Sequence, residues 1–435
     1  MKRRTFIQNT GLATAGVFLG SKTFSNTENK IKIGIVGVGW FGTDVHLTLM
    51  HQSGLFDIVG ICDVNQVCID KALSTCQTIQ APTPKVFKDY KEMYEMPGLQ
   101  AVSIATPTHW HAAMFVDACK KGLNVMLEKP VCFDIEEGKA MLKAQKKAGN
   151  VVAINFKSLN SPAYAQAKAF IKSGEAGKIN QVVGNLFFTG GGNVKELPVP
   201  STIDYDSFCG PAPLQKFMMS TGSVRPEWKF SENMDHGPSF DWGLHYFNNA
   251  RRILDLKLPQ KVSAIGGKIG NNGYETADYL LQSFMYDDLN VQFHCRNFTG
   301  VGPVEDNNIG VYFYGEKATV FIGEFGWEVY QDKKPKISHG SVAFEPWLPQ
   351  MNDNLSKIFI NFAEGVKAKS NANIISPLED SFHATAAMIF GNIAYKTHTE
   401  LTIDTSKIDI IGNETAHKMQ KRAYRKGYIH PANLV

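Results

Sequence analysis

The sequence predicts two domains: an α/β domain built on a parallel sheet, followed by an α+β domain with a large, mostly antiparallel sheet. Three observations support this prediction. At 435 residues, the chain is too long for one ordinary hydrophobic core. Between residues 31 and 156, short β-branched runs alternate with helical patterns, which is typical of a parallel sheet covered on both faces. After residue 161, longer runs of alternating apolar and polar residues indicate antiparallel strands.

The individual elements follow from the same periodicities. The strands expected in the first domain are residues 31–37, 56–63, 101–106, 124–128 and 151–156. Helical patterns between them lie at Val45–Gln52, Val67–Gln77, Tyr90–Glu95, His109–Lys121 and Ile135–Lys147. The later strands are expected at 261–270, 277–286, 290–298 and 309–315, with helices at Ala163–Lys172, Leu355–Ala368, Ser381–Tyr395 and Glu414–Arg425. We therefore place the two domains at 30–157 and 158–435.

The first 29 residues differ from the rest of the chain in their pattern of charged and apolar residues. They begin "MKRRTFIQNTGLATAGVFLG", a basic start followed by an apolar run from Gly11 to Gly20. That run is too short to span a bilayer, which takes about 20 helical residues. Arg3 and Arg4, followed by Phe6 and Ile7, are similar to a twin-arginine export signal. We expect an export signal and linker at 1–29, and a periplasmic protein; the alternative is an unstructured N-terminus on a cytoplasmic one.

Composition narrows the class of partner. The net charge is only +4, and no Lys/Arg run stands out beyond the first four residues, so a nucleic-acid partner is not expected. The seven cysteines fall singly, without C-x-x-C pairs or histidine clusters at zinc spacing. Neither a disulfide framework nor a metal site is therefore predicted.

The stretch "GVGWFG" (37–42) follows the first strand and opens a helix. In a dinucleotide site, Gly37 permits the tight turn, Gly39 lets the backbone approach a pyrophosphate, and Gly42 allows close packing of helix on strand. The N–H groups at the start of the helix can then bind phosphates. We expect a Rossmann domain, with Trp40 and Phe41 also contacting the cofactor.

Asp63 ends the second strand, twenty-one residues after Gly42. An acidic side chain at this place can bind the adenosine ribose hydroxyls, although it could also be an ordinary turn carboxylate. It would repel a 2′-phosphate, and the next residues, Val64, Asn65 and Gln66, supply no cation. NAD is therefore favoured over NADP. If the protein is exported folded, we expect the cofactor to be tightly bound.

Three further stretches carry a resemblance: "ATPTHWHAAM" (105–114), "MLEKPV" (126–131) and "DWGLH" (241–245). Together they resemble the Gfo/Idh/MocA family of oxidoreductases, over nearly all of the chain after Ile31. The resemblance implies a Rossmann domain followed by an α+β domain with an open sheet, through which copies of the chain associate. "DYDSFCGPAP" and "RPEWKF" resemble the branch of the family that acts on carbohydrates or polyols.

Glu128, Lys129 and Pro130 follow the strand that ends at the predicted ligand crevice. We expect Glu128 and Lys129 to line the cofactor site. Lys129 could donate a hydrogen bond to a substrate oxygen and favour an alkoxide-like transition state. The alternative from the residues alone is a surface lysine at a strand end; the resemblance implies the catalytic role and a cis Lys-Pro bond.

Asp241 and His245 are four residues apart, so on a helix they share one face. The imidazole could take a hydroxyl proton near neutral pH, while the carboxylate orients it. The alternative is a capping Asp241 and a core His245. The resemblance implies the catalytic pair.

The remaining candidates are weaker signals. Thr106 should lie over the cofactor, and the resemblance implies His111 near the nicotinamide ribose. Lys157 is the one cation in a run where many relatives carry arginine. Together with Arg225 and Trp228, it is a candidate for the substrate wall.

The leading hypothesis is an exported, NAD-binding oxidoreductase that acts on a secondary alcohol of a sugar, glycoside or cyclitol. A second hypothesis is a redox-neutral enzyme that retains NAD and cleaves glycosides or swaps hydrides between sugars. A third is a non-catalytic, sugar-binding protein on the same fold.

Overall fold

The computed structural model describes residues 30–187, 194–220, 226–270, 273–297, 309–323, 326–331 and 347–435. The expected export signal at 1–29 lies outside the described residues, as does the candidate substrate residue Arg225. Residues 31–435 form one compact unit, in which strands gather into two large sheets. The boundary expected at residue 157 stays a prediction.

The first large sheet confirms the predicted α/β domain. Its strands are β1 (Ile31–Val36), β2 (Phe56–Cys62), β3 (Lys85–Phe87), β4 (Ala101–Ile104), β5 (Asn124–Glu128) and β6 (Val152–Asn155). They lie in the order β3-β2-β1-β4-β5-β6, and every pair is parallel. The three-residue β3 was not among the predicted strands. The order reverses between β1 and β4, and a crevice for ligands forms at such a point.

Local capping signals fix the helices between these strands. A π-helix (Gly42–Leu47) continues as α1 (Thr48–Gln52), and α2 (Gln66–Thr78), α3 (Tyr90–Tyr94), α4 (Thr108–Lys120) and α5 (Ile135–Ala148) follow. The Asn65 side chain caps α2, and Asp134 with Glu137 forms a capping box on α5. Gly149, with φ +67°, ends α5 in the left-handed conformation that glycine adopts without strain.

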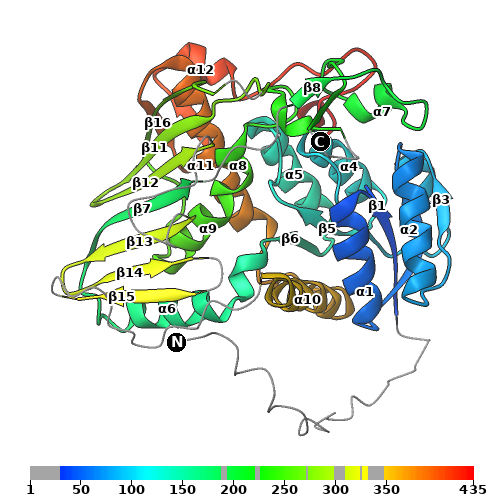
Figure 1. The fold of residues 1–435 in the computed structure, drawn as a ribbon, viewed down its shortest axis with the longest axis horizontal. Coiled ribbons are helices and arrows are strands. Elements are labelled where there is room, and N and C mark those ends of the chain that lie inside the picture. Colours follow the sequence, from blue (N-terminus) through cyan, green and yellow to red (C-terminus); the bar gives the residue numbers. More distant parts are fainter. Residues whose placement is uncertain are drawn as a thin grey trace, which may run out of the picture. The chain divides into compact units, whose positions relative to one another are not determined.

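One face of the parallel sheet is covered by a helix from far along the chain. Helix α10 (Trp347–Ala368) lies beside α1 and β6 in Figure 1. Its residues Ile358, Phe359 and Phe362 join the same buried cluster as Ile33 and Ile35 of β1. The first domain therefore completes its core with a segment nearly two hundred residues beyond its last strand.

The second large sheet confirms the predicted, mostly antiparallel sheet. Its strands are β7 (Ile179–Phe187), β10 (Lys261–Gly267), β11 (Tyr279–Tyr286), β12 (Leu289–Arg296), β13 (Ile309–Gly315), β14 (Thr319–Ile322), β15 (Trp327–Tyr330), β16 (Leu401–Asp404) and β17 (Asp409–Ile411). They lie in the order β15-β14-β13-β7-β12-β11-β10-β16-β17, with β7 and β12 parallel and the other pairs antiparallel. Buried residues alternate along β11 and β12, as with Val291, Phe293 and Cys295 on β12.

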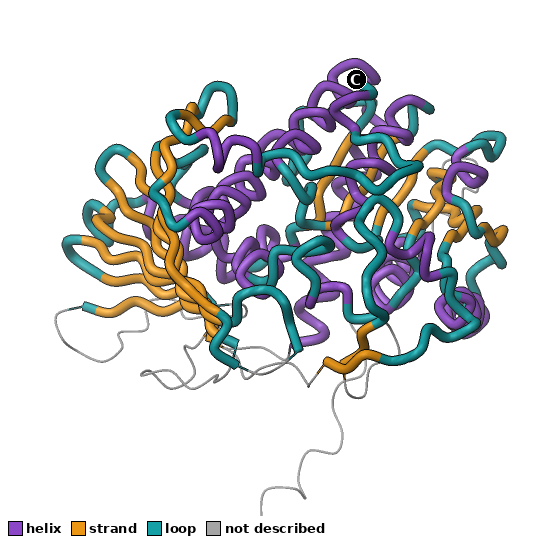
Figure 2. Tube along the Cα trace, turned by 90° about the horizontal axis from the view of Figure 1, so that it is seen from above, coloured by secondary structure: helices purple, strands orange, loops and turns teal. Residues whose placement is uncertain are grey.

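Helices α6 (Pro162–Lys172), α9 (Gly243–Ile253) and α11 (Leu378–Thr397) pack on this sheet, which stands as a stack of strands in Figure 2. Smaller elements are the β8 (Val194–Glu196) and β9 (Met218–Ser220) pair, α7 (Tyr205–Cys209) and α8 (Pro238–Asp241). Within the described ranges, no helix is both long and apolar enough to cross a bilayer.

The last predicted helix is too long. Helix α12 (Glu414–Lys418) ends seven residues before the predicted Arg425. Beyond it, Gln420, Arg422 and Tyr424 bond to groups elsewhere in the chain rather than along a helix axis. Tertiary hydrogen bonds therefore override the helical pattern of this segment.

Candidate functional site

A cavity of about 810 Å³ lies at the carboxyl ends of the parallel strands, within the size range of ligand pockets. Residues from Ile203 onward form its other walls. The cavity brings together most of the predicted site: Gly37, Gly39, Trp40, Phe41, Gly42, Asp63, Thr106, Glu128, Lys129, Lys157, Trp228, Asp241 and His245 all line it. His111 does not line it.

The glycine turn has the shape that a dinucleotide requires. Gly37 has φ +83°, and a Cβ there would meet the Ala105 carbonyl at 2.7 Å. A Cβ on Gly42 would lie 1.8 Å from the Gly37 carbonyl oxygen, so only glycine lets this helix approach the turn. A Cβ on Gly39 would meet nothing within 4 Å, which leaves open space above the turn. These residues fit a bound pyrophosphate.

Asp63 lines the cavity just after the end of β2, and its carboxylate also accepts hydrogen bonds from the backbone nearby. Its Oδ2 accepts a hydrogen bond from the Val38 N–H, and its Oδ1 accepts one from the Asn65 N–H, each at 2.9 Å. Burial raises the pKa of Asp63, while these bonds and the charge of Lys88 oppose the shift. Lys88 comes from beyond β3 and lines the same cavity. The three residues that follow Asp63 supply no cation, as the sequence indicated. A cation from another part of the chain, Lys88, nevertheless acts on Asp63.

Glu128 is held in place by two buried side chains. His46 Nε2 lies 2.7 Å and Asn155 Nδ2 lies 2.6 Å from Glu128 Oε1. The other ring nitrogen of His46, Nδ1, lies 2.6 Å from the Ser103 hydroxyl, which settles the ring orientation. The cavity wall behind Lys129 is therefore rigid.

Lys129 reaches across to Asp241, which is the last residue of α8. Its Nζ donates to the Asp241 carbonyl at 2.7 Å and to Asp241 Oδ1 at 2.5 Å. An ammonium group has three N–H donors, so one remains for a ligand. Lys229 contacts the other carboxylate oxygen, Oδ2. Although burial opposes ionisation, these two lysines lower the pKa of Asp241 far below its usual value.

His245 lies in the first turn of α9, separated from α8 by Trp242. Asp241 and His245 therefore line one cavity. Their spacing predicted that they share the face of one helix, but they lie on two separate helices. Among the described residues, no hydrogen bond joins them, because both carboxylate oxygens of Asp241 face lysines. The expectation that Asp241 orients His245 directly is thus corrected.

The surroundings of His245 keep its ring in the neutral form. Burial, reinforced by the charges of Lys129 and Lys157, lowers the pKa of His245 well below its usual value, so the ring is neutral at neutral pH. Its Nδ1 is enclosed and has no hydrogen-bond partner within the part of the chain that the structure describes. Because Nδ1 is enclosed, we expect Nε2 to be the nitrogen that meets a ligand, and Phe156 packs edge-on against the ring.

His111 lies behind the cavity wall, so its expected place near the nicotinamide ribose stays a prediction. It is buried, with Nδ1 2.6 Å from the Pro130 carbonyl and Nε2 2.9 Å from the Thr106 carbonyl. It thereby ties the cis Lys129-Pro130 segment to the end of β4. We assign it a positioning role behind the cavity wall.

The cavity is lined by two pairs that each consist of a lysine and a tryptophan. Lys157 Nζ lies 5.4 Å from the ring centre of Trp242, and Lys229 Nζ lies 5.5 Å from that of Trp228. Sequence reasoning singled out Trp228 but missed Lys229, the next residue. It also missed Asn155, whose only signal is its position at the end of β6.

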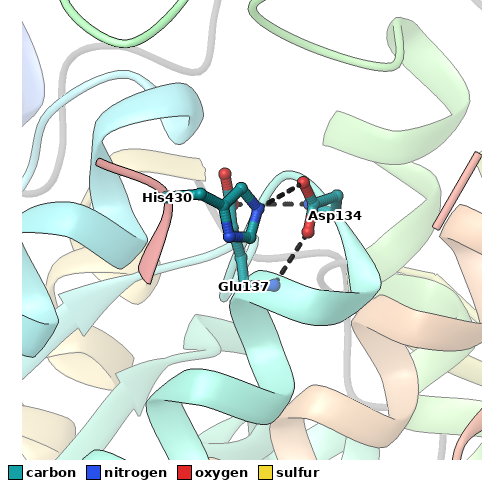
Figure 3. A group of neighbouring side chains, drawn as sticks. All are labelled: Asp134, Glu137 and His430. Carbon is teal, nitrogen blue, oxygen red and sulfur yellow. Dashed lines mark hydrogen bonds and ion pairs between the residues drawn. The ribbon is translucent and has the colours of Figure 1, made fainter. Parts of the chain in front are cut away.

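A second cluster has the composition of a metal site. Asp134, Glu137 and His430 offer ligand atoms within 4.8 Å of one another, and Figure 3 shows their side chains converging. These atoms are already engaged: Glu137 Oε1 accepts from Arg422 and Tyr424, and His430 Nε2 lies 3.1 Å from Asp134 Oδ2. A guanidinium group within the cluster repels a cation, so we assign these residues to the anchoring of the C-terminal segment.

The stability of the protein should depend on pH through Asp235, a buried carboxyl group close to Asp241. Burial and the charge of Asp241 raise the pKa of Asp235 to about 7. Because the unfolded carboxyl ionises near pH 4, this group stabilises the native state fully below that pH, and its contribution is lost as the pH rises through about 7. An amide cannot ionise and keeps the acceptor for the Gly237 N–H, which lies 2.8 Å from Asp235 Oδ1.

For Asp235→Asn, we therefore expect the free energy of unfolding, relative to wild type, to rise by roughly 1–4 kcal/mol between pH 4 and pH 8. Urea unfolding at both pH values measures this difference. The same difference at both pH values would show that Asp235 does not titrate in this window.

Comparisons with known proteins identify the first domain. Residues 31–156 match the model of the oxidoreductase family with an NAD-binding Rossmann fold, Gfo/Idh/MocA. The chain is 30% identical over 154 residues to scyllo-inositol 2-dehydrogenase (NAD(+)) of Bacillus subtilis, which is 35% of this chain and 43% of that protein. It is 26% identical over 160 residues to a glycosyl hydrolase family 109 protein of Shewanella sp., 31% of this chain and 35% of that one. These matches span less than half of the relatives' length.

Solved structures extend the likeness to the whole fold. The aldose-aldose oxidoreductase from Caulobacter crescentus, complexed with glycerol, superposes with a TM-score of 0.64 at 16% identity, over 86% of this chain and 100% of that one. The WlbA dehydrogenase from Bordetella pertussis, in complex with NADH and UDP-GlcNAcA, gives 0.63 at 18% identity, over 86% and 98%. At such identities the likeness shows the fold alone. Residues 31–156 therefore match the Gfo/Idh/MocA family of oxidoreductases, with its NAD-binding Rossmann fold.

Proposed function

We propose that this protein is an NAD-dependent oxidoreductase acting on a secondary alcohol of a sugar, glycoside or cyclitol. One observation carries the proposal: Lys129 and His245, from opposite halves of the chain, line the same cavity as the glycine turn. The curated relatives named for inositol dehydrogenation and for glycoside hydrolysis support a substrate of this class.

NAD, when bound, supplies the acceptor for a hydride. The chain's own residues would then manage the proton and the developing charge. His245 Nε2, on a neutral ring, accepts the hydroxyl proton. The third N–H of Lys129 donates to the same oxygen as negative charge develops on it. Asp241 fixes Lys129 through two hydrogen bonds, so the donor is already in position before the substrate arrives.

We propose NAD rather than NADP, because the Asp63 carboxylate stands where a 2′-phosphate would lie. Lys88 lines the same cavity and acts electrostatically on Asp63, so the choice of cofactor is tested directly. The purified protein is titrated with each nucleotide by calorimetry. Tighter binding of NADP than of NAD would overturn the choice without touching the proposed reaction.

The proposed activity is tested with a panel of sugars, glycosides and cyclitols. We expect absorbance at 340 nm to rise with at least one of them in the presence of NAD, and we expect His245→Gln to abolish the change. Binding of sugars without any reaction, and unchanged by His245→Gln, would favour the non-catalytic hypothesis instead.

Two segments that form the outer walls of the cavity support a second candidate function. The cavity walls include Ile203 and Phe208 from one distant segment and Tyr428 and Ile429 from another, so a bound nucleotide would be covered on the adenosine side. A redox-neutral enzyme, in which the hydride returns to a sugar, needs no exchange of cofactor. Export by way of residues 1–29, which we also propose, would favour the same behaviour. Sustained turnover without added NAD, detected by product analysis, distinguishes it from net oxidation.

A further inference from the structure

The segment of residues 202–211 crosses the carboxyl end of β2, next to Asp63. The Gln66 N–H donates to the Thr202 carbonyl at 2.8 Å, and the Asp204 N–H donates to the Val64 carbonyl at 3.0 Å. Ile203 forms an isolated antiparallel bridge with Asn65. The segment is therefore tied by its backbone to the side of the cavity where a nucleotide's adenosine would lie.

Residues 422–430 form a second segment that passes along the cavity, opposite residues 202–211. Arg422 Nη2 donates to Glu137 Oε1 at 2.8 Å, and the Tyr424 hydroxyl donates to the same oxygen at 2.8 Å. His430 bonds to Asp134 at the start of α5, as Figure 3 shows. Because Glu137 and Asp134 are buried, these bonds are poorly screened by water, and the segment is firmly anchored where it passes the cavity.

Arg425 connects the segment of residues 422–430 to the segment of residues 202–211. Its backbone N–H donates to the Pro211 carbonyl, and its Nε donates to the Gly210 carbonyl, both at 2.9 Å. Its Nη1 and Nη2 contact Asp206 Oδ1 and Oδ2 at 2.7 and 3.1 Å, a two-point pairing of guanidinium with carboxylate, and Nη2 also donates to the Asp206 carbonyl. Arg425 thus bonds to three residues of the facing segment: to Asp206 and Gly210 through its side chain, and to Pro211 through its backbone.

On the cavity side, Trp110 contacts both segments. The Phe208 carbonyl accepts from Trp110 Nε1 at 3.1 Å, and Trp110 packs edge-on against Tyr428. Trp110, Phe208 and Tyr428 all line the cavity. The joint between the two segments is therefore continuous with the wall that a bound nucleotide would touch.

We propose that residues 202–211 and 422–430 form a clasp, joined by Arg425, that retains the nucleotide in the cavity between turnovers. The inference rests on the proposed function, in that the cavity must bind a nicotinamide dinucleotide. A covered nucleotide can leave only when the clasp opens, and opening breaks the Arg425 bonds together. Release should therefore be slow in wild type and limited by this joint.

The test compares Arg425→Gln and Asp206→Asn with Lys172→Gln, a control that removes a cation from a surface pair with Asp255, away from the cavity. Each protein is loaded with NAD, freed of excess by gel filtration, and chased with isotopically labelled NAD; mass spectrometry then gives the release rate. We expect release to be at least tenfold faster in Arg425→Gln than in wild type, and unchanged in Lys172→Gln.

Asp206→Asn leaves the carbonyl bonds of Arg425 in place, so it should accelerate release by a smaller factor and still fold. The double variant should release little faster than Arg425→Gln alone, because both changes act on one joint. Thermal unfolding of the nucleotide-free proteins identifies any general loss of stability. Release in both single variants within twofold of wild type would overturn the clasp while NAD binding stood, whereas no NAD binding in wild type would overturn the proposed function and the clasp with it.

Discussion

Lys129→Met is expected to lower kcat by about 10²–10⁴-fold while leaving NAD affinity within a few-fold of wild type. Methionine keeps most of the side-chain volume but cannot donate to a substrate oxygen or to Asp241. Asp241 keeps its second partner, Lys229, so the buried carboxylate is not left without a cation. The loss should therefore appear in turnover and not in folding. Steady-state kinetics and NAD calorimetry on the same preparation measure both quantities.

Lys229→Met is the matched control, because Lys229 contacts the other oxygen of the same carboxylate. Its substitution removes one charge from the site but leaves both bonds from Lys129 to Asp241. We expect a loss of roughly tenfold or less, since a supporting charge is removed and not a donor to the reacting oxygen. Equal losses in the two variants would show that Lys129 serves only to hold Asp241.

Gly42→Ala and Gly39→Ala should separate folding from nucleotide binding. A methyl group on Gly42 would lie 1.8 Å from the Gly37 carbonyl oxygen, so helix and turn must move apart. We expect a loss of about 2–5 kcal/mol of unfolding free energy, in the range of severe overpacking. A methyl group on Gly39 has open space around it, so Gly39→Ala should fold with nearly wild-type stability.

The same methyl group on Gly39 would point into the space expected for the pyrophosphate. We expect NAD affinity to fall at least tenfold in Gly39→Ala, as measured by calorimetry. Thermal unfolding without nucleotide supplies the stability comparison for both variants. Wild-type NAD affinity in Gly39→Ala would mean that the nucleotide does not approach this turn.

Short-range patterns were sufficient for much of the fold and the cavity. The parallel sheet follows from buried β-branched runs, and the glycine turn follows from backbone requirements that three residues in fixed spacing satisfy. The placement of Lys129 at the cavity follows from its position at the end of a strand, because all parallel strands end at one edge.

Other features depend on contacts between distant residues. The spacing of Asp241 and His245 predicts one helical face, but two short helices meet at Trp242, and lysines occupy the carboxylate. Lys229 lies 100 residues beyond Lys129, and no local pattern indicates that both lysines contact one aspartate. The helical periodicity of residues 419–425 is likewise overruled by hydrogen bonds to the first domain.

By itself, the sequence determined the elements whose causes are local: five strands of the parallel sheet, β10 to β13 of the second sheet, most helices, the glycine turn, and the strand ends that carry Asp63 and Lys129. The tertiary structure alone decided that α10 completes the first core, that Asp241 lies between two lysines, and that residues 202–211 and 422–430 meet over the cavity. The physical reason is that periodicity and capping act within a few residues. Ion pairs and hydrophobic contacts between segments that lie hundreds of residues apart depend on how the whole chain packs.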